Sequence, residues 1–171
     1  MSRLGRAAAA GVVGALAYLA EQELDRRLAN PRSDDLVLLG GLVTTREAAW
    51  RPLGLVMHLL AGASFGIGFE TVAAPLLRGP YWLRGLVVAQ LENALLWPIL
   101  VLIDRVHPAV RTGALRPMNR PVYFAQAVLR HAALGAALGA VLGSPYRTGP
   151  DRATPRSLGH RRPSPDLGRR G

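Results

Sequence analysis

Residues 121–143 read PVYFAQAVLRHAALGAALGAVLG, a run of 23 residues in which Arg130 is the only Asp, Glu, Lys or Arg. The run is apolar nearly all round a helix, so it lacks the polar face that a helix of a soluble bundle needs. About 20 apolar residues cross the roughly 30 Å hydrocarbon core of a bilayer as a helix. This stretch therefore predicts a transmembrane helix.

Three further apolar stretches, at 4–24, 52–77 and 83–103, have the same character. None alternates polar and apolar residues as a barrel strand does, so all are expected to be helices. The sequence predicts an all-α fold, a four-transmembrane-helix bundle that forms one domain over 1–143. The first stretch also fits a cleaved signal peptide, because two arginines precede a short apolar core that ends in small residues.

Composition narrows the class of protein further. The 171-residue chain has a formal net charge of +10, but the charge lies between the apolar stretches rather than along one stripe. That distribution argues against nucleic acid and favours membrane lipid as the partner. The absence of cysteine excludes disulfides, thiolate metal sites and cysteine nucleophiles. Residues 144–171 contain seven Arg and five Pro, which predicts a disordered basic C-terminal tail.

The connecting segments carry weaker signals. Residues 36–43 are apolar but too short to span, so we expect a surface or interfacial segment, with Ser33 as its cap. Thr44 and Glu47 have the spacing of a capping box, which would start the second helix before residue 52. The link at 78–80, RGP, predicts a tight turn that makes the second and third helices antiparallel neighbours.

Arginine placement gives the expected orientation. The side that holds both termini has eleven arginines, and the opposite side has nine in its two loops. Cytoplasmic segments carry the excess of basic residues. We therefore expect a multi-pass protein of the cell (inner) membrane with both termini in the cytoplasm.

The second and fourth helices share a pattern at an offset of 73 residues. In each, an aromatic residue lies eight positions before a histidine, His58 or His131, and glycines follow the histidine at four and eight positions. Two copies of a helical hairpin explain this pattern. The glycines also form small-residue faces, which let helices approach closely within the bundle or in a homo-oligomer or other membrane partner.

Five polar residues fall at similar depth in the predicted membrane. His58 and His131 lie roughly 12 Å, and Glu92 roughly 15 Å, from the aromatic residues near the starts of their helices. Asn93 and Arg130 are their neighbours in sequence. Ionisable residues at such depth normally face the bundle interior and pair. The sequence therefore predicts an intramembrane polar cluster in which Arg130 pairs with Glu92.

This cluster supports three interpretations. In the first, it is structural, and its hydrogen bonds fix the register of the helices. In the second, Glu92, Arg130, His58 and His131 serve a small transporter or a proton or ion relay, which requires a cavity that reaches a membrane face. In the third, the two histidines bind haem or a metal. We expect no cofactor or metal, with each histidine bonded to its own partner across the bundle.

The sequence lacks several common catalytic and phosphate-binding motifs. The chain has no glycine-rich phosphate loop, no H-E-x-x-H and no G-x-S-x-G, so no enzyme activity is predicted. His107 and His160 lie in polar segments and are expected to be solvated. Glu70 is expected to pair with Arg78 or Arg84 near the opposite interface.

The chain resembles small four-span bacterial membrane proteins of uncharacterised function. The similar motifs are the acidic end of the first helix at 21–27, the DDL run at 34–36, the DRVHP run at 104–108 and the stretch at 131–139. The resemblance covers most of residues 5–143 and excludes the tail. It implies a membrane location and no particular activity.

Overall fold

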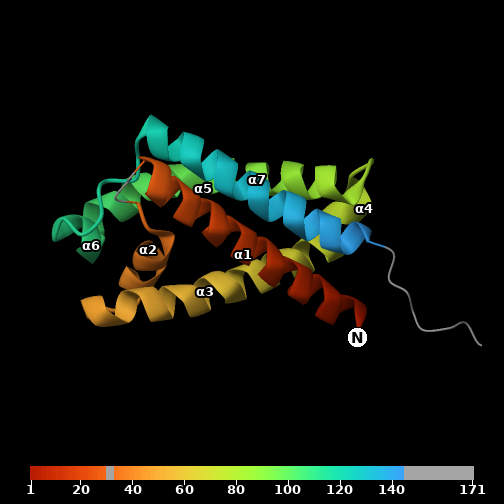
Figure 1. Cartoon of the computed structure of the whole chain (residues 1–171), viewed down its shortest axis with the longest axis horizontal. Coiled ribbons are helices and arrows are strands. Elements are labelled where there is room, and N and C mark those ends of the chain that lie inside the picture. Colours follow the sequence, from red (N-terminus) through yellow and green to blue (C-terminus); the bar gives the residue numbers. More distant parts are fainter. Residues whose placement is uncertain (30–32, 145–171) are drawn as a thin grey trace, which may run out of the picture.

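The computed structural model describes residues 1–29 and 33–144, and the regular elements in those ranges are all helices (Figure 1). In chain order they are α1 Arg3–Ala29, α2 Asp35–Gly41, α3 Glu47–Gly68, the π-helical turn η1 Phe69–Ala73, α4 Ala74–Leu76, α5 Tyr81–Val106, α6 Pro108–Arg111 and α7 Pro121–Gly143. Four helical stretches are long and apolar enough to cross a membrane, namely Arg3–Leu28, Glu47–Leu76, Tyr81–Val106 and Pro121–Gly143. The predicted tail beyond Ser144, including His160, lies outside the described residues.

The first two long helices extend beyond their predicted bounds. α1 continues past residue 24, where Glu23 and Arg27 form an ion pair of 2.9 Å across one helical turn. α3 begins before residue 52, as predicted, but the capping box does not form. The Thr44 hydroxyl oxygen instead accepts the backbone N–H of Arg46 at 3.2 Å, and Arg46 is the N-cap residue.

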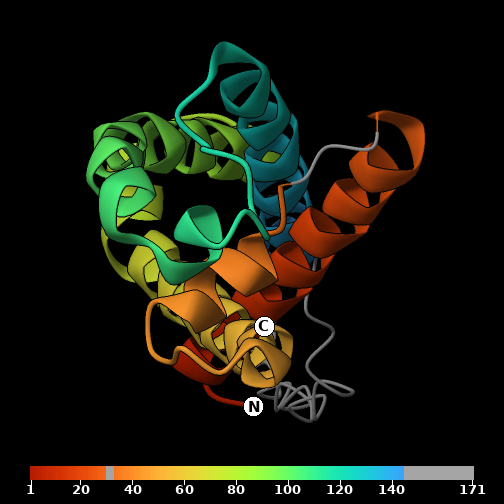
Figure 2. The same ribbon diagram turned by 90° about the vertical axis from the view of Figure 1, so that its left-hand side faces the viewer.

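The long helices pack in the spatial order α3, α1, α7, α5 (Figures 1 and 2). The tight turn at 78–80 does make α3 and α5 antiparallel, and they meet through η1 and α4 near that turn. Away from the turn they separate, because α3 packs on α1 and α5 packs on α7. The prediction that they are neighbours is therefore wrong over most of their length.

Small residues explain this choice of neighbours. A Cβ atom on Gly62 of α3 would lie 2.5 Å from the Ala15 Cβ and 2.8 Å from the Gly11 carbonyl oxygen on α1. A Cβ atom on Gly135 of α7 would collide with the backbone of Gly85 on α5. Backbones approach closely at both contacts, as the small-residue faces of the sequence predict.

The two-hairpin repeat stays a prediction. α3 and α7 run in the same direction, and both pack against α1, one on each side of it (Figure 1). This arrangement places the two histidine-bearing helices on either side of α1.

One end of the bundle is closed by the segments between the long helices (Figure 2). α2 packs on α3 and contacts α6, so the segment at 36–43 is a helix that covers this end of the bundle rather than a free surface segment, and its interfacial position stays a prediction. Asp34, not Ser33, caps α2, since its carboxylate accepts the backbone N–H groups of Leu36 and Val37. The buried cluster at this end comprises Leu38, Trp50, Ala109, Leu115, Met118 and Tyr123.

His107 belongs to this closed end and is only 1% exposed, so the prediction of a solvated side chain is wrong. Its Nε2–H donates to the Leu38 carbonyl oxygen at 2.8 Å. Its Nδ1 accepts the backbone N–H of Ala109 at 3.2 Å, which caps α6. Both ring nitrogens are satisfied, which explains how an imidazole is buried here.

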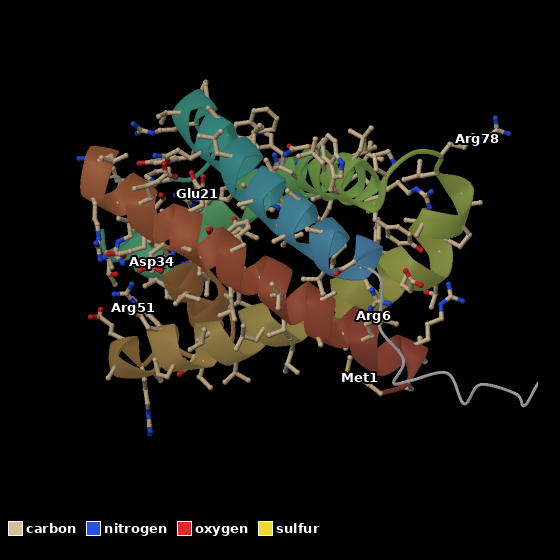
Figure 3. All side chains as sticks on the ribbon, turned by 45° about the vertical axis from the view of Figure 1, so that its right-hand side comes forward. Met1, Arg6, Glu21, Asp34, Arg51 and Arg78 are labelled. Atoms are coloured by element: carbon tan, nitrogen blue, oxygen red, sulfur yellow. The ribbon has the colours of Figure 1, made fainter. Side chains whose placement is uncertain are left out.

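The opposite end holds the N-terminus and the end of α7 (Figure 3). Glu70 pairs with Arg3 at 2.9 Å, and not with Arg78 or Arg84 as predicted. The Arg84 guanidinium instead donates to backbone carbonyl oxygens, including that of Gly79 at 2.6 Å. The Arg3–Glu70 pair ties the start of α1 to the π-helical turn.

Candidate functional site

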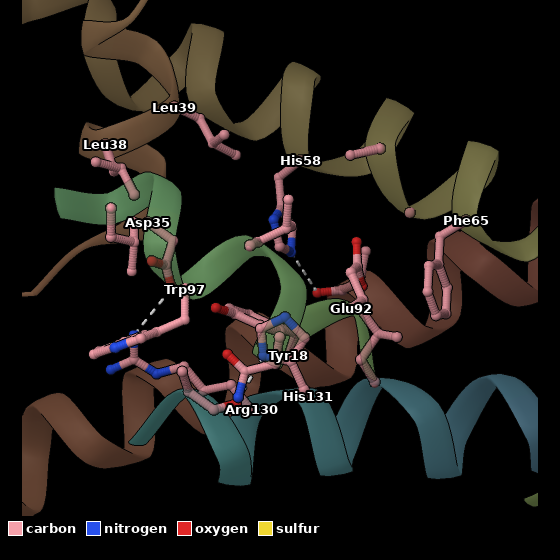
Figure 4. Close-up of a pocket in the computed structure, with 18 of the residues that line it drawn as sticks. Tyr18, Asp35, Leu38, Leu39, His58, Phe65, Glu92, Trp97, Arg130 and His131 are labelled. Atoms are coloured by element: carbon pink, nitrogen blue, oxygen red, sulfur yellow. Dashed lines mark hydrogen bonds and ion pairs between the residues drawn. The ribbon is translucent and has the colours of Figure 1, made fainter. Parts of the chain in front are cut away.

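A cavity of about 230 Å³ lies inside the bundle, and all five residues of the predicted polar cluster line it (Figure 4). That volume far exceeds the roughly 10–15 Å³ that one water needs. Its walls come from α1, α2, α3, α5 and α7, together with Met118 of the connecting segment. The polar and aromatic lining residues are Tyr18, Asp35, His58, Phe65, Glu92, Asn93, Trp97, Tyr123, Arg130 and His131.

Arg130 lies at one side of the cavity, is 2% exposed, and does not pair with Glu92. Its guanidinium forms ion pairs with Asp35 at 2.9 Å, Asp25 at 3.0 Å and Glu21 at 3.5 Å. It also donates to the Ser33 hydroxyl at 3.2 Å and to the Gln22 side-chain oxygen at 3.4 Å. The predicted pairing of Arg130 with Glu92 is therefore wrong.

The reason lies in two elements whose extent the sequence did not reveal. Because α1 continues past residue 24 to Ala29, Asp25 lies on the same helix one turn after Glu21, within the bundle rather than beyond it. Because α2 folds back onto α3, Asp35 is 8% exposed and reaches α7. In the sequence, the spacing of Glu21 and Asp25, which places both carboxylates on one face of a helix, was the feature that could have indicated these partners of Arg130.

The group around Arg130 carries more negative than positive charge. One guanidinium contacts three carboxylates, and its Nε, Nη1 and Nη2 atoms all have partners. A buried ion pair is tolerated only when such hydrogen bonds satisfy its members. Arg130 is therefore a bonded structural centre that joins α1, α2 and α7.

Glu92 and Asn93 present a different picture on α5. Within the described ranges, Glu92 has no ion pair or hydrogen bond, although its half-buried side chain lines the cavity. Asn93 is 5% exposed, and its Nδ2 atom has no partner in the described part of the chain. The Asn93 Nδ2 atom is itself enclosed, so Glu92 is the unpaired group of this pair that is open to a bound molecule.

The two histidines lie beside one aromatic ring. The Tyr18 ring centroid is 5.0 Å from that of His58 and 5.1 Å from that of His131. His58 Nε2–H donates to the Ala15 carbonyl oxygen of α1 at 3.1 Å, across the bundle as predicted. His131 Nδ1–H donates at 2.7 Å to Ala127 of its own helix, so the prediction of a partner across the bundle is wrong for His131.

The surroundings of the histidines bear on the haem and metal hypothesis. Tyr18 packs against both imidazoles, so its ring takes up space that a haem or metal ion shared by the two histidines would need. Residues 1–29 and 33–144 contain no group of three or more His, Cys, Asp or Glu side chains placed to hold a metal ion. The cavity is instead lined by single polar groups among apolar and aromatic side chains, which is typical of a site for an organic molecule.

Comparison of the chain with protein-family models, curated proteins and solved structures gives no match.

Proposed function

We propose that the chain is a multi-pass integral membrane protein that binds a small organic molecule in the cavity between its helices. The observation that carries this proposal is the cavity itself, where Glu92 and Asn93 have unused hydrogen-bonding capacity beside apolar walls. The proposed role is binding without catalysis, in the cell (inner) membrane. Membrane lipid is the proposed environment, and a second copy or another membrane protein is a further proposed partner.

The polar layer has two parts in this proposal. The group around Arg130 is structural, because its hydrogen bonds join three helical elements. The part made by Glu92, Asn93, His58 and His131 serves binding. This division retains the structural interpretation for Arg130 and departs from it for the other four residues.

The cavity is proposed to open sideways, toward lipid. Ala61 of α3 and Leu96 of α5 both line it and are both exposed, Leu96 by 49%. These two helices separate away from their connecting turn. A molecule dissolved in the membrane therefore has a route between them.

A proton or ion relay is the second candidate, and the contact of Tyr18 with both histidines favours it. A relay needs a path to each membrane face. Along the bundle axis the cavity ends at Leu38 on one side and at Phe65 on the other (Figure 4). Tyr123 belongs to the same buried cluster as Leu38, and Leu134 to the same cluster as Phe65. The binding proposal requires only the lateral opening, so it is preferred.

Thiol labelling tests whether the cavity is accessible, and a chain without cysteine gives no background. Ala127 lines the cavity, whereas Ala89 is 0% exposed and does not. We expect N-ethylmaleimide to label Ala127→Cys in membranes and to leave Ala89→Cys unlabelled. Adding Ala61→Phe at the opening should slow the labelling of Ala127→Cys. Equal protection of both cysteines would mean a sealed core and would contradict the proposal.

A further inference from the structure

We propose that the molecule bound in the cavity is an organic ammonium ion, a protonated amine on a compact apolar or aromatic group, with Glu92 as its counter-ion. This inference rests on the binding function proposed above and names the class of ligand. It follows from which hydrogen-bonding groups in the wall are already used and which are free.

The donors of the cavity wall are mostly occupied. The Arg130 guanidinium donates from all three of its nitrogen atoms to neighbouring side chains. His58 donates from Nε2 and His131 from Nδ1, in each case to a backbone carbonyl oxygen. In the neutral imidazoles the remaining nitrogens, Nδ1 of His58 and Nε2 of His131, are therefore acceptors.

The free groups are mainly acceptors. Glu92 contributes a carboxylate that has no partner in the described ranges, and the two histidines contribute one lone pair each. The buried donor without a partner in this wall is Asn93 Nδ2. A ligand that fits must bring donors of its own, and an ammonium group brings up to three N–H donors.

The charges of the lining residues also favour a cationic ligand. The acidic and basic lining residues besides the histidines are Asp35, Glu92 and Arg130, and Arg130 is already surrounded by carboxylates. An anion would meet the unpaired Glu92 carboxylate with no free cation nearby. A cation would neutralise Glu92, whose charge is costly to leave unpaired at membrane depth.

The remaining walls suit the body of such a molecule. Phe65, Trp97 and Tyr18 line the same cavity as Glu92 (Figure 4). Aromatic faces attract cations, and an acidic residue beside aromatic rings is a favourable site for an ammonium group. Leucine side chains complete the lining and exclude water. The ligand is therefore amphiphilic, with one charged end.

Three probes of the same shape and different charge test the inference. They are 1-naphthylmethylamine, which is an ammonium ion at neutral pH, 1-naphthalenemethanol and 1-naphthoate. Binding is measured by calorimetric titration of the full chain in phosphatidylcholine nanodiscs, with empty nanodiscs subtracted. We expect the amine to bind about tenfold or more tightly than the alcohol, and the carboxylate to bind most weakly.

Two variants test whether Glu92 is the source of the preference for the amine. Glu92→Gln should abolish the preference for the amine over the alcohol, whereas Glu70→Gln should keep it. Glu70 is a matched control because it is a buried glutamate at the far end of the bundle, paired with Arg3. The comparison of the three probes on the wild-type protein needs no variant. It therefore tests the ammonium assignment even if Glu92→Gln does not fold.

The outcomes separate the two proposals. Tight binding of the alcohol or carboxylate, lost in Ala61→Phe, would overturn the ammonium assignment and leave the binding function intact. Failure of all three probes to bind would overturn the binding function itself. Nanodiscs with added phosphatidylethanolamine distinguish the source of the amine. Loss of probe binding there would assign the site to a lipid amine, and unchanged binding would assign it to a small free molecule.

Discussion

Arg130 shows how one residue can organise a membrane bundle. Its guanidinium is placed among acids from two other elements, Asp25 on α1 and Asp35 on α2, and α7 carries it. Breaking a buried ion pair by removing one partner leaves uncompensated charge, which is far more damaging than losing an exposed pair. Glu92, by contrast, is a half-buried acid with no ion pair or hydrogen bond among the described residues, so its replacement breaks neither.

Stability measurements should separate these two residues. Arg130→Met is expected to destabilise the fold by about 3–5 kcal/mol, because three carboxylates lose their cation. Glu92→Gln should have little effect or stabilise, since it removes an unpaired charge. Unfolding in detergent, followed by circular dichroism, measures both changes.

Arg51→Met is the matched control for Arg130→Met. It removes a 2.8 Å pair with Asp34, but the Arg51 side chain is 51% exposed, so a cost of at most about 1 kcal/mol is expected. The double variant Arg130→Met with Asp35→Leu should cost less than the sum of the two single changes. A loss in Glu92→Gln as large as that in Arg130→Met would contradict the ion-pair assignment.

At the scale of elements, the long helices were predictable and their arrangement was not. Each membrane-length helix follows from local composition, since some 20 apolar residues suffice to identify it. The extension of α1 past residue 24 and the folding of α2 back onto α3 depend on contacts between distant residues. The predicted cluster residues do line one cavity, but the partners of Arg130 arise from those two elements.

The α1–α3 contact gives a test at this scale. Gly62→Ala should destabilise the protein by about 1–3 kcal/mol, because the new Cβ would lie 2.5 Å from the Ala15 Cβ. Gly68→Ala is the control, since a Cβ there meets nothing within 4 Å, and it should be neutral or slightly stabilising. Thermal unfolding in detergent compares the two. Equal stability of both variants would show that α1 and α3 are not in backbone contact.

Over the whole molecule, the two ends of the bundle differ in construction. One end is closed by α2, α6 and their buried cluster. The other carries the start of α1, where Arg6 donates to the carbonyl oxygens of Val141 and Leu142 near the end of α7. The N-terminus and the end of α7 therefore lie at the same end, as expected for a bundle of four helices of membrane-spanning length (Figure 3).

Arginine distribution predicts which end faces the cytoplasm. The end with the termini has eleven arginines in the sequence, against nine in the loops of the closed end. Basic residues near the ends of the spans set orientation, and acidic residues contribute little, so the carboxylates of the closed end do not alter the count. We expect the termini in the cytoplasm and the α2–α6 end outside.

Single cysteines in the otherwise cysteine-free chain test this orientation. Thr112, just after α6, and Ser2, just before α1, are both exposed, so neither substitution disturbs the core. A membrane-impermeant maleimide applied to intact cells should label Thr112→Cys, and Ser2→Cys should react only after the membrane is permeabilised. Labelling of Ser2→Cys in intact cells would show that the N-terminus lies outside, and the predicted orientation would be wrong. The cavity would keep its lateral opening in either case, because that opening lies between α3 and α5 rather than at an end.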